Sequence, residues 1–461
     1  MSDRTVERLA SYAANLTFAD LPAEVVHQTK RVLIDSLGCA VGALASEPAR
    51  IIRELAVSFA GERRATLLGT DARCSPDWAA FHNGTLVRYL DFNDAYTGSH
   101  PSDNFAPVLA AAEANGASGR ELITGCVLAY EVQAAWADTF SLGEDAWDQT
   151  VYACSSMPLG VGKVMGLDEA QLAEALRISV VSGIALNETR RGRLSHWKAA
   201  AVPNAGRNAV VAALLARSGF SGPDAVYEGA QGFFAGITRR PLELAPLAGE
   251  GGNAHPFRIM ESRIKRFPSV IYSQTAIEGA LEARAVLGIR DADDVRDVHV
   301  GASEHAITSM AGHPSRWQPE TRETADHSLP FLIACALEHG AVEPAHFTDD
   351  ELRKPGTAEL MQKVRASEDE ACQAAWPEAS PSVVTVETTD GRRHTAKVTY
   401  HLGHARRPVA DADIEAKFRG LARGSLSEAQ QNAAIKALWD LDQTSDLRGV
   451  LNLFATATAR A

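Results

Sequence analysis

Apolar residues recur at intervals of three and four through the first half of the chain. Positions 25, 26, 29, 32, 33 and 37 follow this spacing, and so do positions 122, 126, 128, 129 and 132. This is the period of an amphipathic α-helix with one buried face. Pro22 and Glu24 suit a first helical turn, and Gly116 is placed to end a helix predicted over 105–115. The pattern predicts that helices dominate residues 2–219.

The period changes after Phe267. Apolar and polar residues alternate over 295–300, which predicts a short strand. Residues 382–387 and 394–401 predict the two strands of a hairpin, because the Asp390-Gly391 pair between them favours a tight turn.

Helical periodicity also occurs within this region, over 272–287 and 329–339, and it returns from Asp411 to the C-terminus. Strands and helices within one stretch indicate a mixed α+β unit. We therefore predict a mainly α fold with an α+β lid. A large all-helical domain is formed by the N- and C-terminal segments, and a smaller mixed domain is inserted between them. The predicted boundaries are 1–266, 267–406 and 407–461.

The composition is that of an ordinary globular protein. The chain has 461 residues, of which 46% are hydrophobic and 22% charged. A single hydrophobic core seldom serves more than about 250–300 residues, which agrees with a division into two domains. The formal net charge of −13 would repel a phosphate backbone, so nucleic acids are excluded as partners.

The six cysteines are scattered, and no two of them form a CxxC pair. This spacing argues against a disulfide framework, a zinc ribbon and an iron–sulfur cluster. HExxH, a Walker loop and GxSxG are also absent, and no metal site is predicted. No apolar run reaches the roughly 20 residues of a membrane span, and the N-terminus lacks a signal-peptide core. We expect a soluble, cytoplasmic protein without a membrane partner.

The densest polar stretch is 89–104, which joins two predicted helices. Loops of this kind often carry function. His100 precedes a helix start, where unpaired N–H groups and the helix dipole attract an anion such as a carboxylate. Asp91 is placed to orient the imidazole or to act beside it as an acid or base. The alternative is structural: Ser102 and Asp103 cap helices and turns, and His100 lies on the surface.

Four cations and a histidine lie within residues 187–198 of an otherwise acidic chain. Lys198 is followed by small residues, so it can be drawn into a tight interior where the pKa of its amine falls toward that of a useful base. Neighbouring arginines such as Arg191 can clamp carboxylates with two hydrogen bonds. A solvated basic helix end explains the same residues equally well.

Two further polar stretches lie at the predicted domain change and beyond it. Residues 263–275 contain Lys265 and lie at the junction, where ligands often bind, although a basic surface turn is the alternative. A later loop contains His327, which suits an acid or base step. In that loop Asp326 and Ser328 are equally good helix caps.

Six short blocks occur in one order over nearly the whole chain. They are IDSLGC at 34–39, YLDFND at 89–94, HPSDN at 100–104, LSHWK at 194–198, KRFP at 265–268 and ADHSLP at 325–330. Together they resemble the MmgE/PrpD family, which contains 2-methylcitrate dehydratase, cis-aconitate decarboxylase and iminodisuccinate epimerase. The resemblance implies a large helical domain, a smaller α+β lid and usually a homodimer.

The resemblance also assigns residues to a site. Asp91 and His100 match the acidic and histidine positions of the family's first loop, Lys198 matches the lysine of its basic segment, and Lys265 matches the lysine at the lid junction. With His327, these are the predicted catalytic residues. The predicted substrate-binding residues are Arg191, Ser195, Ser102, Gln149, Arg266 and Phe331.

Three positions depart from the family pattern. Gln149 stands where many members have a histidine, Phe331 where relatives have a tyrosine, and Ala95 where some relatives carry a hydroxyl. Glutamine does not titrate and phenylalanine has no proton to donate, so no chemical step in this chain can use those groups.

The function implied by the resemblance is a cofactor-independent hydro-lyase that acts on a small di- or tricarboxylic hydroxy acid of the 2-methylcitrate type. The alternatives are an epimerase or a decarboxylase of a small polycarboxylate, of the iminodisuccinate or cis-aconitate type, and a non-catalytic carboxylate-binding relative. No cofactor is implied. The expected partners are the polycarboxylate substrate and a second copy of the chain.

A mechanism follows from these assignments as a hypothesis. Lys198, Lys265 and the arginines near Arg191 would hold the substrate carboxylates and stabilise the enediolate-like charge that develops after proton loss. His100, oriented by Asp91, would handle the proton. A second acid, either His327 or a lysine, would protonate the departing hydroxide.

Overall fold

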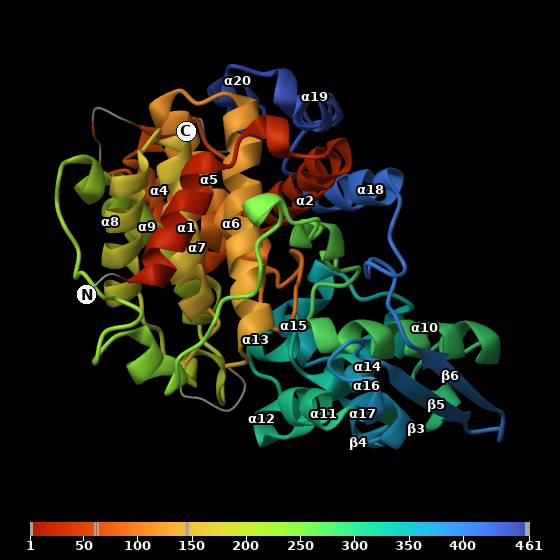
Figure 1. Cartoon of the computed structure of the whole chain (residues 1–461). Coiled ribbons are helices and arrows are strands. Elements are labelled where there is room, and N and C mark those ends of the chain that lie inside the picture. The colour runs from red at the N-terminus through yellow and green to blue at the C-terminus, as the bar shows by residue number, and fades with distance from the viewer. Residues whose placement is uncertain (1–2, 60, 62–63, 143–146, 457–461) are drawn as a thin grey trace.

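The computed structural model describes residues 3–59, 61, 64–142 and 147–456. The fold is mainly α-helical and includes one mixed four-stranded sheet. Figure 1 shows most of the helices gathered on one side of the molecule and the sheet with its own helices on the other.

Nine helices precede the sheet region among the described residues. Helix α5 coincides with the predicted helix over 105–115, and it ends at Gly116, whose φ of 68° is a left-handed conformation that glycine adopts without strain. The nine are α1 Arg4–Asn15, α2 Ala23–Gly42, α3 Glu47–Ala56, α4 Pro76–Tyr89, α5 Phe105–Asn115, α6 Gly119–Thr139, α7 Thr150–Val164, α8 Glu169–Ser182 and α9 Trp197–Arg217. A two-stranded ribbon, β1 Ala65–Thr66 with β2 Arg73–Cys74, lies among them.

The C-terminal helices pack back against the N-terminal ones. They are α18 Asp411–Ala422, α19 Glu428–Trp439 and α20 Leu447–Asn452. Figure 1 shows α18 beside α2. Gly38 permits this approach, because a Cβ at that position would lie 3.2 Å from the ring of Phe418. One hydrophobic cluster accordingly draws its residues from positions 6–264 and 414–454.

The sheet has the strand order β4-β3-β5-β6. Its strands are β3 Val295–Ala302, β4 Val364–Glu368, β5 Ser382–Thr388 and β6 Arg393–Val398. Strand β3 pairs in parallel with β4 and antiparallel with β5, and β5 and β6 form the hairpin predicted around Asp390-Gly391. The second strand of that hairpin is shorter than predicted, because it ends at Val398 rather than at 401.

Helices cover this sheet and form a second hydrophobic cluster with it, drawn from positions 267–386. Helix α10 lies over β5 and β6, and Gly279 lets it approach, since a Cβ there would lie 2.9 Å from Val384. The helices of this region are α10 Gln274–Leu287, α11 Glu304–Ala311, α12 Pro314–Trp317, α13 Arg322–Ala325, α14 Leu329–His339, α15 Asp349–Leu352, α16 Pro355–Lys363 and α17 Glu370–Ala374.

The packing of α4 against α9 positions the polar loops. Gly84 of α4 faces Pro203 of α9, and a Cβ on Gly84 would lie only 2.9 Å from the proline ring. The small residues predicted to follow Lys198 therefore allow a close helix contact. Lys198, in the first turn of α9, thereby comes close to the loop that follows α4.

No single helix among the described residues is long and apolar enough to cross a membrane. In the part of the chain that the structure describes, one pair, α2 and α3, bent by 93°, meets the length and composition criteria together. All six cysteines are buried and unpaired.

Candidate active site

Asp91 is the centre of the densest buried ion network. Helix α4 ends at Tyr89, and Asp91 then adopts a φ of 49°, which is uncommon for a residue other than glycine. Strained backbone of this kind persists only where the surroundings fix it, and it is concentrated at functional sites. The side chain is almost completely buried.

Three cations surround the Asp91 carboxylate. Lys265 Nζ lies 2.5 Å from Oδ1 and 2.9 Å from the main-chain oxygen of Asp91, and Arg88 Nη1 lies 2.8 Å from Oδ1. Lys198 Nζ lies 3.1 Å from Oδ2. Burial would raise the pKa of Asp91, but the nearby cations hold it well below its ordinary value. Asp91 is therefore ionised throughout the neutral range.

Lys265 has an amine suited to proton transfer near neutral pH. Its side chain is buried, and burial lowers its pKa to about 8 against the opposing attraction of Asp91. Arg88 and Lys198 add to the lowering because they are like charges. Lys265 thus carries a proton at neutral pH and releases it more readily than an ordinary lysine.

Asp326 holds Lys198 and brings the loop before α14 against the end of α4. Lys198 Nζ donates to both carboxylate oxygens of Asp326, at 2.6 and 2.7 Å. Arg322 Nη1 contacts Asp326 Oδ2 at 3.2 Å and the main-chain oxygen of Tyr89 at 2.7 Å. Residues from the two parts of the chain that build the separate hydrophobic clusters therefore meet in one ion network.

His327 lies on Asp326 and presents one ring nitrogen outward. Its Nδ1 is 2.6 Å from Asp326 Oδ1, so the Nδ1 hydrogen is donated to that carboxylate. No described residue binds Nε2, and the side chain is 14% exposed. Burial, aided by Lys198, lowers the pKa of His327 to about 4. The ring is neutral at pH 7, with a free lone pair on Nε2.

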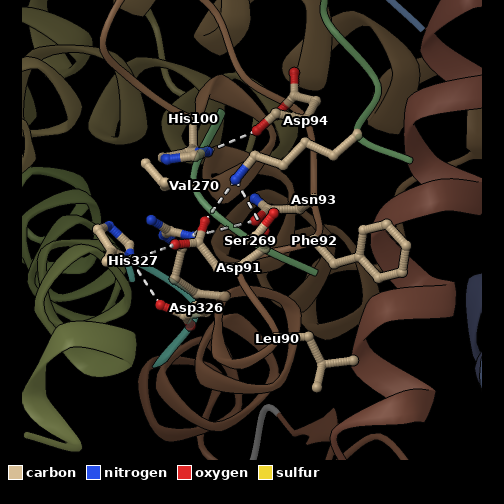
Figure 2. Close-up of polar contacts among 12 residues, drawn as sticks. Leu90, Asp91, Phe92, Asn93, Asp94, His100, Ser269, Val270, Asp326 and His327 are labelled. Atoms are coloured by element: carbon tan, nitrogen blue, oxygen red, sulfur yellow. Dashed lines mark hydrogen bonds and ion pairs between the residues drawn. The ribbon is translucent and has the colours of Figure 1, made fainter. Parts of the chain in front are cut away.

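His100, like His327, donates its Nδ1 hydrogen to an oxygen acceptor, but the acceptor is a main-chain oxygen. Its Nδ1 donates to the main-chain oxygen of Asp94 at 2.6 Å. Burial, together with Arg88 and Lys265, lowers the pKa of His100 well below its ordinary value. Figure 2 shows His100 and His327 on the same side of Asp91. The site therefore holds two neutral imidazoles whose Nε2 atoms are free of partners among the described residues.

Neutral hydrogen bonds hold the loop that carries Asp91 and His100. Asn93 Nδ2 donates to Ser102 Oγ at 2.9 Å and to Asp103 Oδ1 at 2.8 Å. Asp94 accepts from the Tyr130 hydroxyl at 2.8 Å. Burial raises the pKa of Asp94 to about 6 and that of Asp103 to about 7, so both carboxyls tolerate protonation at low cost.

Lys417 of α18 joins the loop that carries Asp91 to the segment that carries Lys265. Its Nζ donates to the main-chain oxygens of Phe92 and Lys265, at 2.7 and 3.0 Å, and pairs with Asp35 of α2 at 2.6 Å. The ammonium also lies 3.7 Å from the centre of the Phe92 ring. The C-terminal helices thus fix the positions of Asp91 and Lys265.

The charge balance of this network favours an anionic ligand. Arg88, Lys198, Lys265 and Arg322 face two ionised carboxylates, Asp91 and Asp326. The carboxyl of Asp103 lies 3.7 Å from Arg88 Nε, and its pKa of about 7 leaves it only partly ionised at neutral pH, so the four cations remain in excess. Asp91, Asp326 and His327 also offer three ligand atoms within 4.8 Å of one another, as a metal site would. Lys198 already binds both carboxylates, however, so a metal ion would have to displace its ammonium. These residues fit a polyanion better than a cation.

Comparisons with known proteins identify the family of the chain. A model of the MmgE/PrpD N-terminal domain matches residues 7–244, and a model of the MmgE/PrpD C-terminal domain matches residues 267–442. The chain belongs to the MmgE/PrpD family. Asp91, His100 and Lys198 lie in the first matched region, and Asp326 and His327 lie in the second.

Several curated MmgE/PrpD relatives are similar along most of their length. 2-Methylcitrate dehydratase of Escherichia coli (strain K12) is 27% identical, over 88% of this chain and 87% of the relative. The protein of the same name from Salmonella typhi is 28% identical, over 93% and 92%. Human cis-aconitate decarboxylase is 24% identical, over 95% and 92%. These MmgE/PrpD relatives are enzymes, and their names include both a dehydratase and a decarboxylase.

The structure brings the five predicted catalytic residues of this MmgE/PrpD chain together but corrects one pairing. Asp91 does not orient His100. The main-chain oxygen of Asp94 holds that imidazole, because the Asp91 carboxylate is already bound by Lys265, Arg88 and Lys198. Ser102 supports the loop, since its hydroxyl accepts from Asn93.

Three predicted substrate-binding residues lie on the surface. Arg191 is exposed, and the preceding Arg190 is the one that turns inward, to Asp148 at 2.7 Å. Ser195 is exposed, and its hydroxyl accepts from the main chain of Trp197 at 3.3 Å. Arg266 is exposed and lies over the Phe267 ring at 5.4 Å. Successive side chains of an extended segment point in opposite directions. Lys265 points inward, and the next residue, Arg266, therefore points outward.

Phe331 and Gln149 differ from the prediction in other ways. Phe331 is 1% exposed and packs 5.5 Å from Phe347 in the second hydrophobic cluster, so it belongs to the core rather than to a binding surface. Ser328 caps the helix that begins there, as one alternative expected. Gln149 precedes the first turn of α7, and its Oε1 is buried without a hydrogen-bond partner among the described residues.

Sequence reasoning missed Arg88 and Arg322. Arg88 lies three residues before Asp91 on a helix whose other late positions are apolar, and a cation in such a buried stretch needs a nearby acid. That signal was available in the sequence. The role of Arg322 was not, because its acceptors on Tyr89 and Leu90 are main-chain oxygens from a distant segment.

Proposed function

We propose that this chain is a cofactor-independent dehydratase of a small di- or tricarboxylic hydroxy acid of the 2-methylcitrate type. The observation that carries the proposal is the excess of buried cations around Asp91 beside two neutral imidazoles. The names of the dehydratase relatives support the same reading.

Substrate binding and charge stabilisation follow from the cations. Each substrate carboxylate offers the counter-charge that the network lacks, and a buried cation gains most from such a partner. Removing the proton next to a carboxylate creates enediolate-like charge. Lys198 and Lys265 are held in place by Asp326 and Asp91, so they stabilise that charge without rearranging.

The proton transfers are assigned from the state of each group. His100 removes the carbon-bound proton with Nε2, because its low pKa keeps the ring neutral. The electron pair of the broken C–H bond forms the double bond, and the C–O bond of the hydroxyl breaks. Lys265 supplies the proton that converts the departing hydroxide to water, since its pKa of about 8 leaves it protonated at neutral pH. His327 lacks a hydrogen on Nε2 and accepts a hydrogen bond from the substrate instead.

Incubation with three substrates in deuterated water tests the proposal. 2-Methylcitrate, cis-aconitate and iminodisuccinate are supplied separately, and products are followed by NMR. An alkene from 2-methylcitrate supports dehydration. Deuterium exchange without loss of water from any substrate would indicate an epimerase, and unchanged bound ligand would indicate a binding protein.

Decarboxylation is the second candidate because a relative over 95% of this chain is named cis-aconitate decarboxylase. The same cations could stabilise the carbanion left by loss of CO₂. Release of CO₂ from cis-aconitate, with no alkene from 2-methylcitrate, would favour this reaction.

We further propose that residues 267–406 form an inserted lid on a helical body of residues 1–266 and 407–461. The separate hydrophobic cluster at positions 267–386 supports this division, as do the Asp326–Lys198 and Arg322–Tyr89 contacts across it. Hydrogen exchange measured with and without tricarballylate is the test. Binding should protect residues 321–327, and equal exchange in both states would count against a lid.

A homodimer is proposed from an apolar surface patch. The rings of Phe59, Trp78, Phe81 and Trp197 contact one another in a row, at 4.5, 6.0 and 6.5 Å, and Phe59 and Trp197 are exposed. Patches of this kind mark interfaces. Light scattering of the wild type should give a molar mass twice that of the chain. Trp197→Glu should lower this measured mass. A monomeric wild type would refute the dimer.

We also propose a cytoplasmic location, supported by the six unpaired thiols. Recovery of the protein outside the cytoplasmic fraction after cell fractionation would contradict it.

A further inference from the structure

A second group of polar side chains lies beside the Asp91–Lys265 pair. Arg263 exchanges two main-chain hydrogen bonds with Ala95, each of 2.9 Å, in the loop that also carries Asp91 and His100. The next residue, Ile264, donates to the main-chain oxygen of Gly403 at 2.9 Å. These bonds place Arg263 between the Asp91 loop and the segment that contains His401 and His404.

The direction of the Arg263 side chain follows from the alternation of the chain. Ile264 is buried in the first hydrophobic cluster, and residues on either side of it in an extended segment point the opposite way. Arg263 and Lys265 therefore project toward the same side. Lys265 binds Asp91 from that side.

Several polar atoms here have no hydrogen-bond partner among the described residues, although the Nδ1 atoms of His401 and His404 are bound to the main chain of Leu402 and Arg406. The Arg263 guanidinium makes no hydrogen bond and no ion pair, and the Tyr272 hydroxyl makes no hydrogen bond. His401 and His404 are 3% and 6% exposed, and the Nε2 atom of each is buried and unpaired. Two buried imidazole nitrogens are costly unless a ligand satisfies them, and the Arg263 guanidinium and the Tyr272 hydroxyl are free to bind the same ligand.

Electrostatic effects connect this group to the catalytic cluster. Burial raises the pKa of Tyr272 to about 12, and Arg263 opposes that rise. Burial lowers the pKa values of His401 and His404 to about 3 and about 4, and Arg263 adds to both shifts; Lys265 also lowers that of His401. Asp91 raises the pKa of Tyr272. Tyr272 and His401 therefore lie within the electrostatic reach of both Arg263 and the Asp91–Lys265 pair, in agreement with the main-chain bonds that join Arg263 to the Asp91 loop.

The charge of the group selects the ligand. A metal ion is disfavoured, because Arg263 and Lys265 are both positive and the carboxylate that faces Lys265, Asp91, is already bound by three cations. A guanidinium without a counter-ion matches a planar carboxylate, which accepts two parallel hydrogen bonds from it. A phenol and neutral imidazoles can donate further hydrogen bonds to the same anion.

We infer that Arg263 binds a carboxylate of the substrate, distinct from the one held by Lys198, with the Tyr272 hydroxyl donating to the same group. The inference rests on the proposed function, because it assumes a polycarboxylate bound at the Asp91 cluster. It adds which residues hold two of the substrate carboxylates, Lys198 one and Arg263 another. A monocarboxylate would satisfy only one of the two positions.

Steady-state kinetics of Arg263→Met with 2-methylcitrate tests the inference. A lost charge-assisted pair should raise KM by about 10- to 100-fold, with kcat changed much less, because the contact is made equally in the ground and transition states. Arg263→Lys should recover part of the loss. Arg266→Met is the matched control, since Arg266 is exposed on the same segment, and its KM should equal that of the wild type.

Titration calorimetry separates a binding role from a structural one. The wild type should bind tricarballylate about 10- to 100-fold more tightly than glutarate, which lacks the central carboxylate, or than butyrate, which has one carboxylate. In Arg263→Met this preference should disappear. The comparison with glutarate shows it if Arg263 binds the central carboxylate, and the comparison with butyrate shows it if Arg263 binds a terminal one. Tyr272→Phe should weaken the binding of tricarballylate by about 2- to 10-fold.

The outcomes distinguish the inference from the function beneath it. Wild-type protein that binds and converts no polycarboxylate refutes the proposed function. An active wild type whose Arg263→Met variant keeps its KM and its ligand preference refutes the inference alone. An Arg263→Met variant that loses kcat instead of affinity, with an unchanged melting temperature, also refutes it.

Discussion

Replacing Asp91 by Asn removes one negative charge from the centre of the site while keeping the size of the side chain. The carboxylate is 1% exposed and contacts Lys265 at 2.5 Å, Arg88 at 2.8 Å and Lys198 at 3.1 Å. Breaking a buried ion pair by removing one partner typically costs about 3–5 kcal/mol. We expect the free energy of unfolding of Asp91→Asn to fall by about this amount at pH 7.

The loss should depend on pH because Lys265 can give up its proton. In the wild type its folded pKa is about 8, below its ordinary value of 10.5. Without Asp91 the ammonium form loses its partner, so this pKa falls further. The unfolded state then binds more protons than the folded state over a wider range, and stability rises with pH across it. The difference between variant and wild type should therefore shrink from pH 7 to pH 9.

Urea unfolding at pH 7, 8 and 9, followed by circular dichroism, measures this difference. Asp94→Asn is the control, because Asp94 is a buried carboxyl of the same loop that accepts from the neutral groups Tyr130 and Ser102. Its pKa of about 6 predicts a smaller loss that stays constant over the same pH range. A loss below about 1 kcal/mol for Asp91→Asn, or one that does not change with pH, would refute the reasoning.

Two further predictions concern the proton transfers. The value of kcat/KM should fall above about pH 8 as Lys265 loses its proton, and Lys265→Arg should move this limb to higher pH. If the fall of kcat/KM stays near pH 8 in that variant, a group other than Lys265 causes it. His100→Gln should lower kcat by about 100- to 10,000-fold, with an unchanged melting temperature, whereas His327→Gln should mainly raise KM. The reverse pattern would exchange their roles.

Local sequence signals predicted much of the fold. Helices over 105–115 and 329–339 and the hairpin around Asp390-Gly391 depend on caps and turn residues close by, and all three are present. Strand β4, Val364–Glu368, could not be predicted in this way. Only Val364 of that strand is buried, and its hydrogen bonds come from β3, which lies more than 60 residues earlier.

The candidate site shows the same limit. Residue types pointed to polar stretches with a structural alternative for each, and the resemblance to the family selected residues within them, among them Asp91, His100, Lys198 and Lys265. Partner choice was not predictable. Asp91 has four groups within reach, and which of them it binds is decided by how α4, α9 and the loop before α14 pack together.

Lys417 makes the order of synthesis matter for this protein. The loops that carry Asp91 and Lys265 leave the ribosome well before α18 does, and N-terminal segments generally fold first. Until residue 417 has been added, two main-chain oxygens under the catalytic groups and the buried Asp35 lack their cation. A nascent chain can therefore form the helices that precede α18 and remain inactive, and activity should begin only after residue 417 has left the ribosome.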